Sequence, residues 1–420
     1  MILNIEFDGY KFFDNSSISF TADARTKKLL SNSTELDGKN VLKAVGLYGS
    51  NNSGKTNIVK LMSLIKKVLI GADNILFNNL VFKDSIETSI SITFNNLNEK
   101  GWLKYEFTYN NEKKQYEREK LISLSFYDSG NVFQKVIFEK DTRAKILNVF
   151  DVDQSKFLFI IPSRLPFLYS VELESSEFSG LNDYLTEFKT LAASIQIIKM
   201  YDIPFENTLD TMKKNDTKKV SFIKEFVKNA DISIHNFEFD KDINAEIGGE
   251  INEQALSRFS KVSDTLKLIT TYGDVKVPSF IFDSTGTKKV ESIASYIYDA
   301  IVDGKTLIID EIDNGLHYRL TRSIVSIFNN MLNTKGQLFF VTHDLLLIDC
   351  NKLMRKDQIY FINRTSQKAD LYCLKEATVS EGGPREVNDI VKLYNRGEFV
   401  SVPNPEFIDL IAEVLLNEWC

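Results

Sequence analysis

The sequence contains few of the features that build metal centres, disulfides or membrane spans. Its three histidines and three cysteines lie scattered, without metal-ligand spacing: His235, His317, His343, Cys350, Cys373 and Cys420. This argues against a histidine-rich metal site, and the scattered cysteines suit a reducing cytoplasm. No run of about 18 uninterrupted apolar residues occurs, which disfavours a membrane-spanning helix. The net charge of -7 argues against strong, delocalised DNA binding by a monomer but is compatible with a local basic groove.

The composition predicts a folded chain of two lobes, or of one lobe with an insertion. Its 420 residues are 43% hydrophobic and 26% charged, which is enough to bury a sizeable core. Short strands and a helix over 54–70 come first, followed by β-like runs that predict an antiparallel sheet beside a parallel one. Helical patterns over 181–201 and 220–229 are the clearest in the middle of the chain. We therefore expect an N-terminal lobe over 1–162, a mainly helical insertion over 163–272, a C-terminal lobe over 273–375 and an extension over 376–420.

The clearest motif is a phosphate loop of the pattern GxxxxGK[ST]. Its residues are Gly49, Ser50, Asn51, Asn52, Ser53, Gly54, Lys55 and Thr56, and Asn57 follows them into the predicted helix. A buried strand precedes the loop, which is the context that the pattern requires. Backbone N–H groups of such a loop and of the helix start face phosphates. We expect the Lys55 ammonium to bridge the β- and γ-phosphates and the Thr56 hydroxyl to hold Mg²⁺.

A second motif is an apolar strand that ends in two acids. Residues 306–309 precede Asp310 and Glu311. Asp310 at the strand end fits the Mg²⁺ shell, and Glu311 fits the residue that orients and polarises the attacking water. A strand ending in acids is common, so the motif is informative because it accompanies the phosphate loop.

Two further patterns are weaker when taken singly. Residues 283–288 open a helix that leads into the acidic strand, and a helix start with Ser284 and Gly286 can present a hydroxyl and N–H groups to an anion. Alone, this pattern is more typical of an ordinary helix cap. His343 closes the next predicted strand, where its ring could contact a γ-phosphate, although a lone histidine is more often structural.

Together these motifs resemble the ABC-type ATPase heads of the SMC, RecF and OLD group. They follow that group's order of phosphate loop, long insertion, signature, acidic strand, D-loop and switch histidine. The resemblance is closest to bacterial AAA-labelled ATP-binding proteins of abortive-infection and antiphage operons, whose pattern recurs at 283–288, 310–317 and 342–344, and more loosely at 355–361. It implies an α/β P-loop head with a parallel core sheet, an antiparallel β-subdomain and a mainly helical insertion.

The resemblance also implies a site shared between two copies of the chain. The signature residues Ser284, Gly286, Thr287 and Lys288 would bind the ATP held by the opposing protomer. Asp313 would lie in the D-loop between protomers, together with Asn314, and His343 would be the switch histidine. Lys11, Phe12 and Phe13 occupy the place of a short basic-aromatic segment near the adenine. The signature Ser-Thr-Gly-Thr differs from the Ser-Gly-Gly-Gln of transporters, and no Q-loop glutamine is identified.

Three functions fit these residues. The first is a slow, Mg²⁺-dependent ATPase that dimerises or forms a higher oligomer around ATP and controls a separate nuclease or toxin in antiphage defence. No acidic Toprim-type constellation follows His343, so a fused nuclease is not expected. The second is a RecF-like or SMC-like clamp on DNA, which a lysine run over 213–228 supports, although such a run is more often a solvated face. The third is a nucleotide-gated binding module with little turnover.

Overall fold

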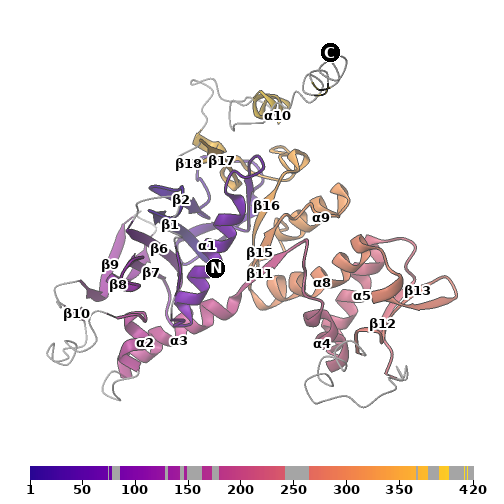
Figure 1. The fold of residues 1–420 in the computed structure, drawn as a ribbon, viewed down its shortest axis with the longest axis horizontal. Coiled ribbons are helices and arrows are strands. Elements are labelled where there is room, and N and C mark those ends of the chain that lie inside the picture. The colour runs from indigo at the N-terminus through magenta and orange to yellow at the C-terminus, as the bar shows by residue number, and fades with distance from the viewer. Residues whose placement is uncertain are drawn as a thin grey trace.

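The computed structural model describes residues 1–73, 75–77, 86–127, 131–141, 146–148, 163–172, 179–241, 264–365, 368–376, 387–396, 411 and 414. Figure 1 shows two lobes on either side of a central parallel sheet. An antiparallel sheet lies on one side, and a group of helices with a small sheet lies on the other. In the described part of the chain, no helix combines the length and the apolar character that a membrane crossing requires.

Seven of the described strands form an antiparallel sheet in the order β10-β9-β8-β7-β6-β1-β2. Along β7, Tyr105 and Phe107 are buried while Lys104 and Glu106 are partly exposed, as expected for a sheet with one face on the core. The strands are β1 (Ile2–Asp8), β2 (Ser16–Ser19), β6 (Glu87–Asn95), β7 (Trp102–Asn110), β8 (Gln115–Phe126), β9 (Val132–Lys140) and β10 (Ile146–Asn148). A separate hairpin joins β3 (Ser33–Leu36) to β4 (Lys39–Leu42).

Six described strands form the second sheet, in the order β11-β15-β16-β5-β17-β18. Neighbouring strands are parallel except at the β17–β18 edge. Every residue of β5, β15 and β16 is buried, which is typical of parallel strands covered on both faces. The strands are β5 (Ala44–Tyr48), β11 (Ile195–Lys199), β15 (Thr306–Asp310), β16 (Gln337–Thr342), β17 (Ile359–Arg364) and β18 (Ala369–Cys373).

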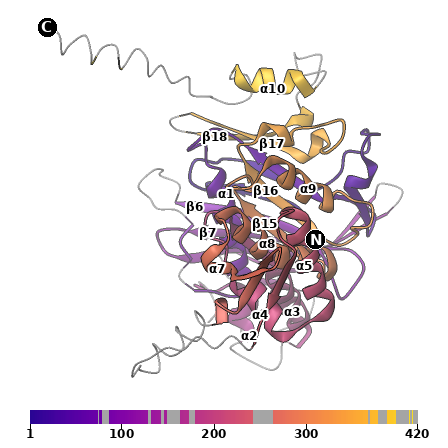
Figure 2. The ribbon, with the colours of Figure 1, turned by 90° about the vertical axis from the view of Figure 1, so that its right-hand side faces the viewer.

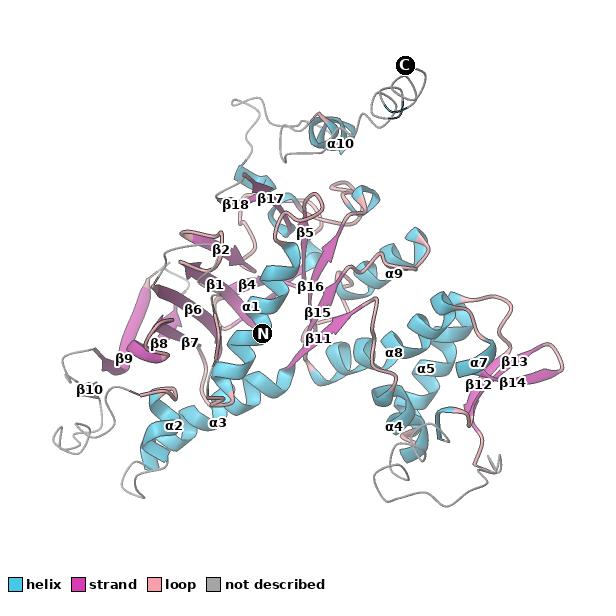
Figure 3. Cartoon of the chain, viewed as in Figure 1, coloured by secondary structure: helices cyan, strands magenta, loops and turns pink. Residues whose placement is uncertain are grey.

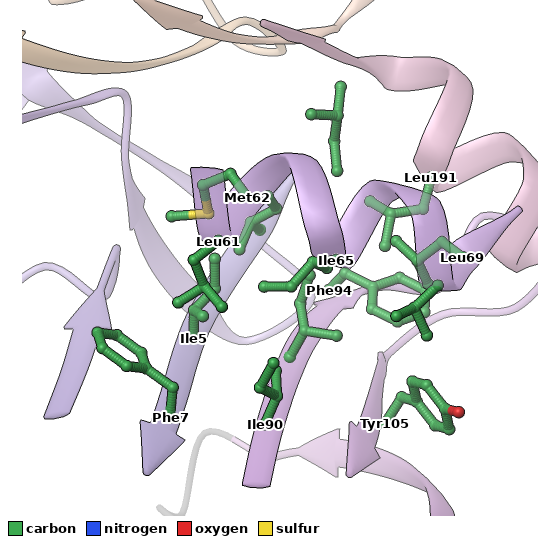
Figure 4. Packing of buried hydrophobic residues seen from close by; sticks show 14 of the residues in the cluster. Ile5, Phe7, Leu61, Met62, Ile65, Leu69, Ile90, Phe94, Tyr105 and Leu191 are labelled. Atoms are coloured by element: carbon green, nitrogen blue, oxygen red, sulfur yellow. The ribbon is translucent and has the colours of Figure 1, made fainter. Parts of the chain in front are cut away.

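Helix α1 (Lys55–Leu69) joins the two sheets through one hydrophobic cluster. Its apolar side chains recur at helical spacing, so Leu61, Ile65 and Leu69 face the same way. Figure 4 shows them meeting Ile5, Phe7, Ile90, Phe94 and Tyr105 of the antiparallel sheet and Leu191 of α3 (Ser179–Ser194). The short helix α2 (Phe167–Glu172) packs against α3. This packing fixes the start of α1, where the phosphate loop ends.

The second lobe has a core of its own. Leu209, Ile223, Phe237, Leu268 and Val290 belong to one buried cluster that holds its helices to its sheet. Figures 1 and 3 show this lobe on the side of the parallel sheet away from the antiparallel one. Its elements are α4 (Glu206–Lys214), α5 (Thr217–Ala230), α7 (Ser279–Phe282), α8 (Thr285–Asp303) and the three-stranded sheet of β12 (Asn236–Phe239), β13 (Leu268–Tyr272) and β14 (Val275–Pro278).

Two further helices accompany the parallel sheet. Helix α9 (Tyr318–Phe328) follows β15, and its Ile324, Val325 and Phe328 pack in the cluster behind that sheet. Helix α10 (Val387–Asn395) lies beside β17 and β18 in Figures 1 and 2, and its Tyr394 ring is 5.9 Å from the Phe361 ring.

One predicted helix is wrong in its second part. The pattern over 181–201 predicts a single helix, but α3 ends at Ser194 and residues 195–199 form β11. This segment contains three isoleucines, whose β-branched side chains fit a strand, and it pairs in parallel with β15. The domain boundaries of the sequence analysis stay predictions, and β11 shows that residues between 163 and 272 also contribute to the parallel sheet.

Candidate nucleotide site

The carboxyl ends of three parallel strands bring the main motifs together. Strand β16 lies between β5 and β15. The phosphate loop follows β5, Asp310 ends β15, and His343 comes directly after β16. This confirms the prediction that His343 lies one strand beyond Asp310. In an open parallel sheet, ligands bind outside this edge.

These residues surround a cavity of about 200 Å³, the nucleotide cavity. It is lined by Asn51, Asn52, Ser53, Gly54, Lys55, Thr56, Asn57, Asp310, Glu311, Val341 and His343. A larger cavity of about 580 Å³ is lined by residues of β1, β2 and β6–β9 on the antiparallel sheet. The larger cavity contains none of the motif residues, so the smaller one is the candidate site.

The phosphate loop closes around its own lysine. Lys55 Nζ donates hydrogen bonds of 2.7 Å to the carbonyl oxygens of Gly49 and Ser50. Burial lowers the pKa of Lys55 to about 8, against the opposing charges of Asp310, Asp313 and Glu311. Gly54 has a φ of 115°, and an added Cβ would lie 3.0 Å from the Phe13 ring, so only glycine fits there. The lysine is therefore held inside the loop, where a phosphate can replace the two carbonyl groups.

The Thr56 hydroxyl and the Asp310 carboxylate form a pair that fits Mg²⁺. Thr56 Oγ1 lies 3.5 Å from Asp310 Oδ1, and Asp310 Oδ2 is buried without a hydrogen-bond partner among the described residues. Burial and the nearby charge of Glu311 raise the pKa of Asp310. An unpartnered buried carboxylate oxygen is costly unless a cation or a donor reaches it. Mg²⁺ takes oxygen ligands and keeps few protein carboxylates when it binds phosphates, which matches this pair.

Glu311 adopts an unusual backbone conformation at the strand end. Its φ is 57°, in the left-handed region that non-glycine residues seldom occupy. Asn314 Nδ2 donates a 2.9 Å hydrogen bond to Glu311 Oε2, and Glu311 lines the nucleotide cavity. Such strain concentrates at functional sites because the surrounding fold holds it. Glu311 thus presents a carboxylate to the nucleotide cavity, and its role as a general base stays a prediction.

His343 and the segment before it join the cavity to the predicted D-loop. Burial and the charge of Lys55 lower the pKa of His343, so the neutral ring is favoured near pH 7. Thr342 Oγ1 donates a 2.6 Å hydrogen bond to Asp313 Oδ1 and accepts one of 2.9 Å from the Asp344 backbone. Asp313 is therefore bound to its own chain's β16. Its contact with a second protomer stays a prediction.

The structure does not bring the predicted signature to the nucleotide cavity of the same chain. We call residues 283–288, at the N-terminus of α8, the helix tip. Ser284 is exposed and caps α8 by accepting a 3.1 Å hydrogen bond from the Thr287 backbone. Gly286 lies against the Gly315 carbonyl, which an added Cβ would approach to 3.0 Å. No helix-tip residue, Lys288 included, lines the nucleotide cavity.

The predicted basic-aromatic segment does lie beside the phosphate loop. Lys11 Nζ donates a 2.7 Å hydrogen bond to Asn57 Oδ1, and the Phe13 ring packs on Gly54. Arg364, which the sequence analysis missed, lies 3.9 Å from the centre of the Phe12 ring. Its guanidinium also donates hydrogen bonds of 2.6 and 3.1 Å to the Asn52 carbonyl and side-chain oxygens.

Lys199 is a second residue that the sequence analysis missed. It ends β11 and pairs with Asp310 in the sheet register, so a positive charge lies beside the acidic strand. The signals for these residues were weak. Arg364 follows an apolar run with no motif, and Lys199 lies in a segment that reads as helix.

One protein family matches the part of the chain that contains these motifs. A family model described as "AAA domain, putative AbiEii toxin, Type IV TA system" matches residues 44–349, from β5 past β16. The chain belongs to this AAA domain family. The match includes the phosphate loop, the helix tip, the acidic strand and His343, and it confirms the resemblance to AAA-labelled proteins of abortive-infection systems.

Individual relatives of this AAA domain protein are distant. A Helicobacter pylori protein named "ATP/GTP phosphatase" is 23% identical over 359 residues, which cover 82% of this chain and 89% of that protein. Among solved structures, the SMC head domain from Thermotoga maritima has a TM-score of 0.40 at 11% identity, with 89% of this chain and 98% of that chain covered. The recombination mediator RecF has a TM-score of 0.37 at 13% identity, with 88% and 98% covered.

The predicted fold class is confirmed. The AAA domain protein has a parallel core sheet with the phosphate loop at its carboxyl edge and an antiparallel β-subdomain beside it. Between residues 163 and 272 the described residues are mainly helical, and they also form β11, β12 and β13.

Proposed function

We propose that this AAA domain protein is a Mg²⁺-dependent ATPase whose nucleotide site is completed by a second copy of the chain. The observation that carries the proposal is Asp310 Oδ2, which lies next to Thr56 without a hydrogen-bond partner among the described residues, in the cavity that Lys55 and Glu311 also line. The nucleotide cavity therefore offers the Lys55 ammonium to phosphates and the Glu311 carboxylate to a water molecule. The oxygen atoms of Thr56 and Asp310 can bind a metal ion. The Helicobacter pylori relative named "ATP/GTP phosphatase" supports hydrolysis.

Each residue has a distinct task in this mechanism. The backbone of the phosphate loop and Lys55 bind the phosphate chain, and Lys55 exchanges the Gly49 and Ser50 carbonyls for phosphate oxygens. Thr56 and Asp310 would hold Mg²⁺, which neutralises charge on the phosphates when bound. Glu311 accepts the proton of the attacking water, and Asn314 orients its carboxylate. The neutral His343 ring can donate a hydrogen bond to the γ-phosphate.

A second copy would supply the helix tip. Ser284 is exposed and lies outside the nucleotide cavity of its own chain, although it caps a long helix whose N-terminus favours anions. Two chains related by a two-fold axis would each offer a helix tip to the other's cavity. ATP then stabilises the closed dimer, and hydrolysis shifts the population toward open chains.

We further propose that this cycle controls a separate effector, a nuclease or toxin, in antiphage defence. The family description, which names the AbiEii toxin and a type IV system, supports the link to abortive infection. A DNA clamp is the weaker candidate because its lysine run is partly neutralised within the chain. Lys213, Lys219 and Lys228 form ion pairs with Asp264, Asp299 and Glu225.

ATP turnover and copurification test the two parts of the proposal. The wild type should release phosphate from ATP only with Mg²⁺, and turnover should be insensitive to added DNA. Expressed with its neighbouring gene product, the Glu311→Gln protein should retain that product on affinity purification with ATP and release it without ATP. Stimulation of turnover by DNA with steep salt dependence would favour the clamp instead. Absence of phosphate release would refute the ATPase.

A further inference from the structure

Two buried carboxyl groups lie at the rear of the helix tip, one at its first residue and one further along α8. Asp283, the residue before Ser284, is 5% exposed, and Glu291, two turns into α8, is 0% exposed. We call Asp283 and Glu291 the carboxyl pair. They belong to the second lobe (Figure 3), where β13 and α7 supply hydroxyl groups to them and α7 packs against β13 and β14. Neither residue lines the nucleotide cavity, so the mechanism above does not use them.

Hydroxyl groups from two elements connect the carboxyl pair. Thr270 Oγ1 and the Tyr272 hydroxyl, both on β13, donate hydrogen bonds of 2.5 and 2.9 Å to Asp283. Ser279 Oγ, on α7, donates one of 2.5 Å to Glu291 Oε2. Thr270 Oγ1 also lies 3.4 Å from Glu291 Oε1, so a single hydroxyl stands between the two carboxyl groups.

No cation compensates the carboxyl pair among the described residues. The lysines in the first turn of α8 are engaged elsewhere, because Lys288 lies 5.6 Å over the Phe280 ring and Lys289 Nζ bonds to Asn314. From the end of α5, Asp231 adds a further carboxylate nearby by accepting a hydrogen bond from Thr287 Oγ1. Two buried negative charges without a cation are strongly unfavourable.

A proton on Glu291 resolves this conflict. Burial, with the hydrogen bond and the charge of Asp283, holds the pKa of Glu291 well above its usual range. A protonated Glu291 can donate to Asp283, whereas two ionised carboxylates would repel each other. The shared proton therefore joins α8 to the residue that precedes Ser284.

We propose that Glu291 is a positioning residue, which holds a proton between itself and Asp283 and thereby fixes Ser284 for the nucleotide of a second copy. The inference rests on the proposed function, because Ser284 matters only if the helix tip meets that nucleotide. Loss of the proton separates Asp283 from Glu291 and moves the helix tip. Displacements of about 1 Å at a site can reduce turnover by about 100-fold. ATP turnover should thus fall as Glu291 ionises.

The direction of the pH effect follows from the raised pKa. The folded protein keeps a proton that the unfolded chain releases near the ordinary glutamate value of about 4.3. The proton on Glu291 makes its full contribution to the free energy of unfolding below that pH. This contribution is lost as the pH rises through the pKa that Glu291 has in the folded protein. Lys55 also titrates in the alkaline range, but it is common to all variants compared below.

The test compares Glu291→Gln with the wild type. The glutamine amide donates to Asp283 at every pH, and its oxygen still accepts from Ser279. We expect kcat equal to that of the wild type at acidic pH, where Glu291 keeps its proton, and a smaller decline of kcat than in the wild type as the pH rises through the raised pKa of Glu291. KM for ATP should be unchanged because the phosphate loop is untouched. Glu291→Ala should lower kcat about 10-fold or more over the whole pH range.

A buried glutamate in the other lobe provides the matched control. Glu187 is 2% exposed and has a raised pKa from burial, but it accepts backbone hydrogen bonds from Leu97 and Asn98, far from α8 in the fold. Glu187→Gln should change the pH dependence of the free energy of unfolding and leave the turnover profile as in the wild type.

Three results would overturn the proposal in different ways. If Glu291→Gln and the wild type unfold with the same pH dependence, Glu291 holds no proton. If their unfolding differs while their turnover profiles coincide, the carboxyl pair does not position the helix tip. If Glu291→Gln is as inactive as Glu291→Ala, the shape of the side chain matters rather than the donated hydrogen bond. If Ser284→Ala keeps full turnover, the nucleotide site is not completed by the helix tip of a second copy. That result would refute the proposed function itself and is distinct from the three results above.

Discussion

The phosphate loop and the helix tip differ in how much of their surroundings one chain provides. The phosphate loop is enclosed: Lys55 is 5% exposed, its ammonium is bonded to the loop, and the end of β15 brings the carboxylates of Asp310 and Glu311 to it. The helix tip has an exposed Ser284 and lines neither of the two cavities described above, and buried hydrogen bonds to Asp283 and Glu291 anchor it from behind. This difference suits the proposed function, in which one chain binds the nucleotide and hydrolysis needs a second copy.

Removing the lysine of the phosphate loop should have the largest effect. Lys55→Ala should abolish measurable ATP binding, a loss of at least about 100-fold in affinity, because a buried charge-assisted contact to the phosphates disappears. Isothermal titration calorimetry would measure it. Lys43→Ala is the matched control, since Lys43 is 2% exposed and bonds to the Asn330 carbonyl outside the nucleotide cavity. Normal ATP binding by Lys55→Ala would contradict the assignment of the loop.

Glu311→Gln should separate binding from hydrolysis. The variant should bind ATP as the wild type does, while kcat falls by about 100-fold or more because a general base is lost. Sizing chromatography with ATP and Mg²⁺ should then show a persistent dimer, as hydrolysis no longer opens it. An unchanged monomer peak would argue against ATP as the link between two chains.

Ser284→Ala should affect turnover while sparing binding to the single chain. A lost hydrogen bond to a charged phosphate is worth about 1.5–3 kcal/mol, which corresponds to roughly 10- to 100-fold in kcat. The variant also loses a helix cap, and Asp216→Ala controls for this because Asp216 caps α5 in the same way. Equal losses of turnover in both variants would mean that the helix tip acts only through stability.

Arg364→Ala should have the smallest effect, and it tests whether Arg364 supports the phosphate loop in binding ATP. Without the guanidinium, Asn52 loses two hydrogen bonds and the loop becomes less ordered before ATP binds. We expect about a threefold loss of ATP affinity with unchanged kcat, measured by a fluorescent nucleotide titration. Arg25→Ala is the control, since Arg25 pairs only with Asp23 on the surface in the described structure. A kcat effect would give Arg364 a role in hydrolysis instead.

The same two regions explain how far the sequence could predict the structure. The phosphate loop, the acidic strand and the cap at Ser284 are local patterns, so their chemistry is readable from neighbouring residues. Strand β11 could not be predicted, because an apolar stretch after α3 suits a helix as well as a strand. Its pairing with β15 in the folded chain makes it a strand.

Contacts between residues that are far apart in the chain could not be predicted from the sequence either. Arg364 reaches Asn52 because β17 pairs beside β5, and Glu291 meets Asp283 because α7 and β13 fold over the start of α8. Neither pair has a characteristic spacing along the chain. The hydroxyls of Thr270, Tyr272 and Ser279 that satisfy the carboxyl pair come from separate elements.

Mixing two inactive variants would test the shared site most directly. In a dimer of Lys55→Ala with Ser284→Ala, one nucleotide site carries both defects and the other is intact. Random pairing should therefore restore about a quarter of the wild-type ATP turnover when the two proteins are mixed. If the mixture stays as inactive as its components while each variant folds and Ser284→Ala still binds ATP, one chain forms the whole site and the account is wrong.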